Sequence, residues 1–162
     1  MPSRYAFLVE TYATEILKVL SVWSMAGDAD LDTRPRQGDR RGRTLREQMV
    51  HQCQSEHGWF SGMFGIVAPG DVLPASPVRE AFLRHYAAAA EFRRAALLGK
   101  DDAWWETVVP FFEVARPRTW ILVRRIAHKA LLLRQQLALA AHVFVGGGDQ
   151  RLQLARGVER SD

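Results

Sequence analysis

The chain has 162 residues, of which 48% are hydrophobic and 25% are charged, and its formal net charge is +4. This length and composition predict one globular domain with a substantial core and argue against a disordered chain. The absence of a long uncharged apolar run argues against a membrane span, and the glutamates at positions 10 and 15 argue against a secretory signal. The single cysteine, Cys53, cannot form an internal disulfide, so we expect a cytoplasmic protein.

The first predicted helix covers residues 5–26, because apolar side chains recur there at steps of three and four residues. Gly27 is its expected C-terminal cap. Residues 28–42 are polar and predict a long connection. This connection begins a run of six arginines: Arg34, Arg36, Arg40, Arg41, Arg43 and Arg46. The run is either a phosphate-binding strip or a solvated loop, and without interleaved aromatic residues we do not expect it to bind nucleic acid.

The second predicted helix runs from Thr44 to Ile66, where Thr44 and Glu47 have the spacing of a capping box. Prolines make residues 65–77 a loop. Ser76 is the expected N-cap of a third helix that ends near Gly99. Residues 101–115 predict a short helical turn, an extended segment and an apolar plug for one end of a bundle.

The fourth predicted helix runs from Pro117 to about Phe144, and three glycines at positions 146–148 are expected to end it. Its expected apolar face consists of Leu122, Val123, Ile126, Ala130, Leu133 and Leu137. We therefore predict an all-α four-helix bundle with long crossover connections over residues 1–145, followed by a charged tail over residues 146–162 that is partly helical or frayed.

Two histidines, His51 and His128, lie near the middle of the second and fourth predicted helices. Both fall off the apolar faces, so they are either two ligands of a metal site between the helices or unrelated surface residues. Glu56 lies on the apolar face of its helix and is expected to pair or to face a polar pocket. Cys53 is expected to be a small buried residue rather than a nucleophile.

Two stretches carry a resemblance to a known family: RTLREQMVHQCQSEHGWF (residues 43–60) and RTWILVRRIAHKALLLRQQ (residues 118–136). They resemble the DinB-like superfamily of small four-helix metalloproteins, also called the YfiT-like fold. Its members typically carry one metal-binding histidine on the second helix and a His-x-x-x-His pair on a later helix, often followed by Arg-Gly-Gln. The resemblance implies that His51 and His128 are the first two metal ligands, with zinc or nickel as the ion.

The third ligand of the family pattern falls on Leu132, whose side chain has no lone pair to give to a metal. The metal site is therefore expected to be impaired. Either ordinary divergence or a shift of reading frame after about Ala130 explains this departure. Translation of the gene in its other two frames would test the second explanation, which requires a histidine and an Arg-Gly-Gln motif to appear there.

Relatives implied by the resemblance transfer low-molecular-weight thiols or act as hydrolase-like enzymes, and they often pair as homodimers through helix faces. A metal in such a site lowers the pKa of a bound thiol or water. The alternative for this chain is a non-catalytic helical protein, such as a dimeric or stress-related one, that holds no metal.

Overall fold

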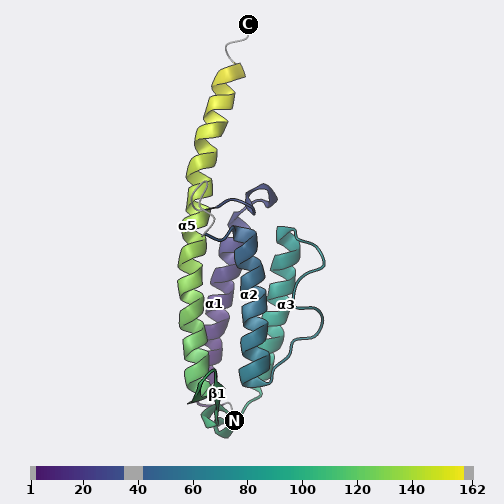
Figure 1. Ribbon diagram of the computed structural model, residues 1–162, viewed down its shortest axis with the longest axis vertical. Helices are drawn as coiled ribbons and strands as arrows, with labels where there is room; N and C mark the ends of the chain where they lie inside the picture. Colours follow the sequence, from purple (N-terminus) through teal and green to yellow (C-terminus); the bar gives the residue numbers. More distant parts are fainter. Residues whose placement is uncertain (1–2, 35–41, 159–162) are drawn as a thin grey trace.

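The computed structural model describes the backbone of residues 3–34 and 42–158, and the side chains of these residues as far as 139 and at 141. Four long helices lie side by side (Figure 1). They are α1 (Ala6–Met25), α2 (Leu45–Trp59), α3 (Arg79–Leu98) and α5 (Arg118–Val158). The shorter elements are the 3₁₀ turn η1 (Asp28–Asp30), the π-helical turn η2 (Phe60–Phe64), the helix α4 (Asp102–Glu106) and the strands β1 (Val108–Phe111) and β2 (Val114–Pro117). The predicted all-α bundle is confirmed.

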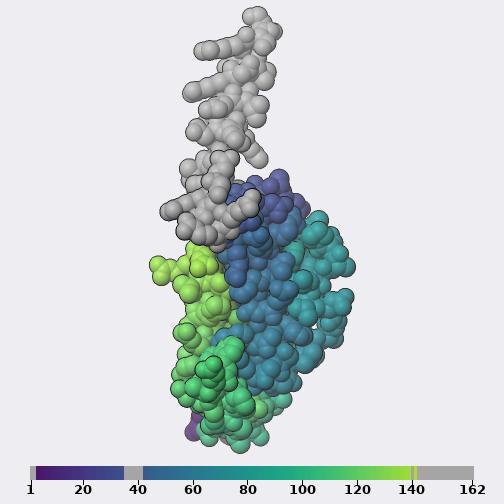
Figure 2. Space-filling model, viewed as in Figure 1, coloured from purple at the N-terminus to yellow at the C-terminus, as the bar shows by residue number. Residues whose placement is uncertain are grey.

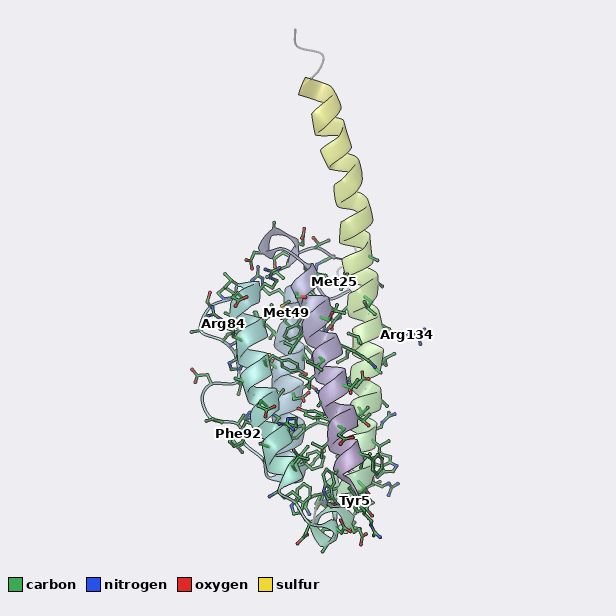
Figure 3. All side chains as sticks on the ribbon, turned by 180° about the vertical axis from the view of Figure 1, so that it is seen from behind. Tyr5, Met25, Met49, Arg84, Phe92 and Arg134 are labelled. Atoms are coloured by element: carbon green, nitrogen blue, oxygen red, sulfur yellow. The ribbon has the colours of Figure 1, made fainter. Side chains whose placement is uncertain are left out.

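Helix α1 lies between α3 and α5 and packs mainly on these two neighbours, as the view from behind shows (Figure 3). Consecutive long helices are therefore not simply paired in chain order. The segments that join α1 to α2 and α2 to α3 are long enough to make such crossovers, as the sequence predicted.

The core consists of large aromatic and aliphatic side chains from all four long helices. Trp23, Tyr86 and Trp105 are almost completely buried. The rings of Trp23 and Tyr86 lie 5.0 Å apart between centroids, so α1 and α3 meet through aromatic contact. On the outside, Phe92 of α3 is 43% exposed (Figure 3).

Helix α2 begins with the predicted capping box. The Glu47 backbone N–H donates to Thr44 Oγ1 at 3.1 Å, and the Thr44 N–H donates to a Glu47 carboxylate oxygen at 2.7 Å. These two bonds satisfy backbone donors that the first turn of a helix leaves free.

The start of α3 differs from the prediction. Val78, rather than Ser76, occupies the N-cap position. The Arg79 N–H donates instead to Asp28 Oδ1 at 2.6 Å, from the turn after α1. The Arg79 guanidinium in turn donates to the carbonyl of Ala26 at 2.5 Å, at the C-terminal end of α1. A residue 51 positions away caps α3, and sequence spacing alone could not show that.

Both ends of the last helix also differ from the prediction. Pro117 ends β2, so α5 begins one residue later, at Arg118. The helix then continues through the three glycines at positions 146–148 and reaches Val158. Each glycine weakens a helix by roughly 1 kcal/mol relative to alanine without removing a backbone hydrogen bond, so glycine alone does not force a stop.

The apolar segment after α3 folds as the short helix α4 followed by an antiparallel hairpin of β1 and β2. The predicted helical turn and extended segment are thus confirmed. The predicted plug is only partly correct: Trp105 is completely buried, whereas Phe112 at the tip of the hairpin is 74% exposed. Phe112 adopts a φ of 52°, which is uncommon for a bulky residue.

Among the clustered arginines that the structure describes, Arg34 and Arg46 pair with carboxylates of their own chain. Arg34 contacts Glu47 at 3.0 Å, and Arg46 contacts Asp32 at 2.8 Å. Arg36, Arg40 and Arg41 lie outside the described residues. Within the described part of the chain, no helix is both long and apolar enough to cross a membrane.

Candidate functional site

The two predicted metal ligands lie at the same level on neighbouring helices. Helix α2 ends where α5 begins, beside the hairpin, so the two helices are antiparallel (Figure 1). The Arg125 side chain of α5 donates to Ser55 Oγ of α2 at 2.9 Å. His51 precedes Ser55 by about 6 Å along its helix, and His128 follows Arg125 by about 4.5 Å in the same direction. Both imidazoles are half-buried.

Helix α2 and the first part of α5, which carry the two histidines, lie next to each other on one face of the molecule (Figure 2). The ring of Trp59 stacks on that of His128, with 6.4 Å between centroids and 9° between planes. Trp59 also meets Phe111 of the hairpin at 5.3 Å. The hairpin and α2 therefore fix one side of the His128 ring.

Positive charges surround both histidines. Burial lowers the pKa of His51, and the charges of Arg43, His128 and Arg125 lower it further. Burial likewise lowers the pKa of His128, with contributions from Arg125, Arg124 and Arg43. Because both pKa values are lowered, the two rings are mainly neutral at pH 7.

The residues around His51 and His128 do not form a complete metal site. Leu132, one turn after His128, is 5% exposed and offers no lone pair. Among the described side chains, no three histidine, cysteine, aspartate or glutamate residues are grouped to hold an ion. The nearby arginines also repel a divalent cation. Two neutral imidazoles in a positive environment thus fit a divalent metal poorly.

A second polar cluster lies beneath this surface, inside the bundle, and it is centred on Glu56. The Glu56 carboxylate is completely buried and accepts hydrogen bonds from Arg125 and Lys129 of α5, each at 2.7 Å. The Tyr12 hydroxyl donates to it at 2.5 Å, and Gln52 Nε2 donates at 3.3 Å. The Tyr86 hydroxyl of α3 also donates to it, at 3.4 Å, so side chains from all four long helices converge on one carboxylate.

The charge of Glu56 is maintained by its cationic partners. Burial alone would raise its pKa, but the charges of Lys129, Arg125 and Arg93 hold the pKa well below its usual range. Arg93 of α3 is 4% exposed, and its guanidinium lies 5.4 Å from the centroid of the Phe60 ring. One carboxylate thus faces two buried arginines and the Lys129 amine, so the cluster keeps excess positive charge even where Lys129 is neutral.

This cluster predicts a dependence of stability on pH. Burial lowers the pKa of Lys129 from 10.5 to about 7, against the attraction of Glu56. Between these two values the unfolded chain binds more protons than the folded chain, so the free energy of unfolding is expected to rise with pH from about 7 to about 10. The slope from one lysine is at most about 1.4 kcal/mol per pH unit. Urea unfolding at several pH values measures it.

The Lys129→Met variant is the control for this pH dependence, because it removes the titrating amine and retains similar volume. Its free energy of unfolding should change less between pH 7 and 10 than that of the original protein. Equal slopes for the two proteins would show that Lys129 has an ordinary pKa in the folded state.

The predicted apolar face of α5 is only partly correct: Leu122 and Leu133 are buried in the core, as expected. Val123 is 50% exposed and Leu137 is 43% exposed, although both were assigned to that face. Arg125, Lys129 and Gln136 are completely buried instead. One sequence feature could have indicated this buried cluster. Glu56 lies on the apolar face of α2, and α5 carries two cations, Arg125 and Lys129, one turn apart. The prediction that Glu56 pairs or faces a polar environment is consistent with this cluster.

The other histidines and Cys53 were weaker candidates for a functional role. Cys53 is 3% exposed, and burial together with the charge of Glu56 raises its pKa to about 12, so its thiol is a poor nucleophile. His57 is half-buried, and His85 Nε2 lies 3.0 Å from the carbonyl oxygen of Val72. The side chain of His142 lies outside the described residues.

The fold is similar to a solved crystal structure of a DinB-like protein from Bacillus cereus ATCC 10987. The two superpose with a TM-score of 0.71 over 84% of this chain and 90% of the other, at 17% sequence identity. No family model and no curated protein matches the sequence. The similarity establishes the DinB-like fold and, at this identity, the fold alone.

Proposed function

We propose that this chain, a protein of DinB-like fold, has a metal site that is impaired and works as a non-catalytic binding protein rather than as a metal-dependent enzyme. In the family resemblance His51 and His128 are two of three ligands. The third position holds Leu132, which is buried and packs in the bundle. This leucine is the observation that carries the proposal.

The charges around the two histidines support the same proposal. Arg43, Arg124 and Arg125 all act on the His128 ring, and no carboxylate of the described residues is among the charges that act on it. A metal enzyme that activates water or a thiol needs its ion held firmly by three protein ligands. Two imidazoles beside three cations provide neither the ligands nor the electrostatic environment.

One observation favours the alternative, in which the chain retains zinc or nickel as a thiol transferase or hydrolase-like enzyme. The two imidazoles are neutral and lie at the same level, so both have a nitrogen lone pair available for coordination. Water would have to supply the remaining ligands, and such a site would bind zinc weakly.

Metal analysis of purified protein separates the two functions. After dialysis against buffer without chelator, we expect far less than one zinc or nickel per chain, and a melting temperature that added zinc leaves unchanged. Near-stoichiometric metal that disappears in both His51→Ala and His128→Ala, but not in the control His57→Ala, would contradict the proposal and support the metal-dependent enzyme.

A further inference from the structure

We propose that the surface around His51 and His128 binds an oxyanion, namely the phosphate group of a small molecule, with Arg124 and Arg43 as its cationic partners. The proposal rests on the proposed function in one respect, because both take this surface to be free of metal. It adds the chemical class of the ligand.

The donors for such a group come from two helices at one level. His51 on α2 and His128 on α5 are both half-buried, so solvent reaches them while the protein partly desolvates them. A neutral imidazole carries one N–H donor, and hydrogen bonds to a charged acceptor are about twice as strong as neutral ones. The contact of Arg125 with Ser55 at 2.9 Å fixes the spacing of the two helices just beside the rings.

Because α2 and α5 are antiparallel, Arg43 and Arg124 lie on opposite sides of the two rings along the helix axes. Arg43 precedes the first turn of α2, and Arg124 lies on α5 one turn before His128. Both side chains are exposed. Within the described part of the chain, Arg124 makes no ion pair with a carboxylate, so its charge is available. Arginine is well suited to phosphate because its planar guanidinium can donate two parallel hydrogen bonds.

The buried cluster strengthens the positive potential of this surface. Glu56 is the carboxylate beneath it, and this carboxylate is already bonded to Arg125 and Lys129. Arg125 Nε is buried and has no hydrogen-bond acceptor among the described residues. The excess positive charge beneath the surface therefore favours an anion and disfavours a divalent cation at the same place.

Titration of the protein with inorganic phosphate in buffer containing a metal chelator tests the proposal. Calorimetry gives the dissociation constant, and NMR signals of the His51 and His128 rings report the place of binding. We expect saturable binding in which both rings shift. His51→Ala, His128→Ala and Arg124→Ala should each weaken binding about tenfold, the size expected when one charge-assisted hydrogen bond is lost.

Two matched controls separate a site from general attraction to a basic protein. Arg84→Ala removes an exposed arginine of α3 that pairs with Glu80 at 3.2 Å, and His57→Ala removes another half-buried histidine of α2. Neither should change phosphate affinity. Equal weakening in the controls, or no saturation at millimolar phosphate, would overturn the proposal. If His128→Ala destabilises the fold, His128→Gln retains an N–H donor and should retain most of the affinity.

The phosphate titration and the zinc measurement together distinguish failure of the anion site from failure of the proposed function. Phosphate binding in chelator alongside stoichiometric zinc in its absence would reject the impaired metal site and keep the anion site. Absence of both would reject the anion site and keep the impaired metal site. Phosphate binding that appears only when zinc is added would reject the anion site, because the metal would then hold the phosphate.

Discussion

Replacing Glu56 with glutamine is expected to lower the free energy of unfolding by about 3–5 kcal/mol. The variant keeps the size and shape of the side chain but leaves the completely buried Arg125 and Lys129 without a counter-charge. The Tyr12 hydroxyl also loses a charged acceptor at 2.5 Å. Urea unfolding at pH 7 measures the change, and the loss should far exceed that of an exposed ion pair, about 0–1 kcal/mol.

Lys129→Met provides a control, because its effect on the free energy of unfolding is expected to depend on whether Glu56 is present. Lys129→Met in the original protein should have a small effect, because Glu56 keeps Arg125 at 2.7 Å. In the Glu56→Gln background the same change should be stabilising, because it removes an unpaired buried cation. If Glu56→Gln costs less than about 1 kcal/mol, comparable to a surface pair, then the cluster is not the buried ionic centre described above.

Replacing Leu132 with histidine is expected to raise zinc affinity roughly 100-fold or more. Residues 128 and 132 lie one turn apart on the same side of α5, across from His51, so the variant would supply the ligand that the family pattern lacks. Competition with a metal chelator measures the dissociation constant. A rise in melting temperature with zinc should accompany tighter binding, because the ion binds only the folded chain.

Leu133→His is the matched control for this gain of metal binding. Leu133 is also buried, at 9% exposure, but it points about 100° away from Leu132 around the helix. It should therefore not gain zinc affinity. Equal zinc affinities in the two variants would mean that position 132 does not face His51 and His128, and the assignment of the two histidines as remaining ligands would fail.

Local sequence patterns predicted the parts of the fold that depend on neighbouring residues. Apolar spacing located the four long helices, since the period of 3.6 residues is set within each helix. The Thr44–Glu47 capping box was also predicted, because both bonds lie within four residues. The fold class followed from these helices, and the DinB-like solved structure confirms it.

Interactions between distant residues were not predictable in the same way. The predicted apolar face of α5 did not include Arg125 and Lys129, and isolated charged side chains rarely lie inside proteins. Their burial requires Glu56, which lies 69 and 73 positions earlier. The capping of α3 by Asp28 has the same cause. Spacing suggested a joint position for His51 and His128 only as one of two alternatives, because helix neighbours are decided by tertiary packing.

The segment after Ala130 also fits the core, whatever its origin. Leu132, Leu133 and Leu139 are buried there. The burial of these leucines does not test the reading-frame hypothesis, which is tested by translating the gene in its other two frames.

The bond between Trp23 and Gln136 has a consequence for synthesis of the chain. Trp23 Nε1 donates to Gln136 Oε1 at 3.2 Å, across 113 positions, and α1 packs against α5 along its length. A ribosome adds about 5–20 residues per second, so α1 emerges several seconds before its partner. During that interval the apolar side of α1 lacks its final cover, and co-translational folding of this bundle must wait for its last helix.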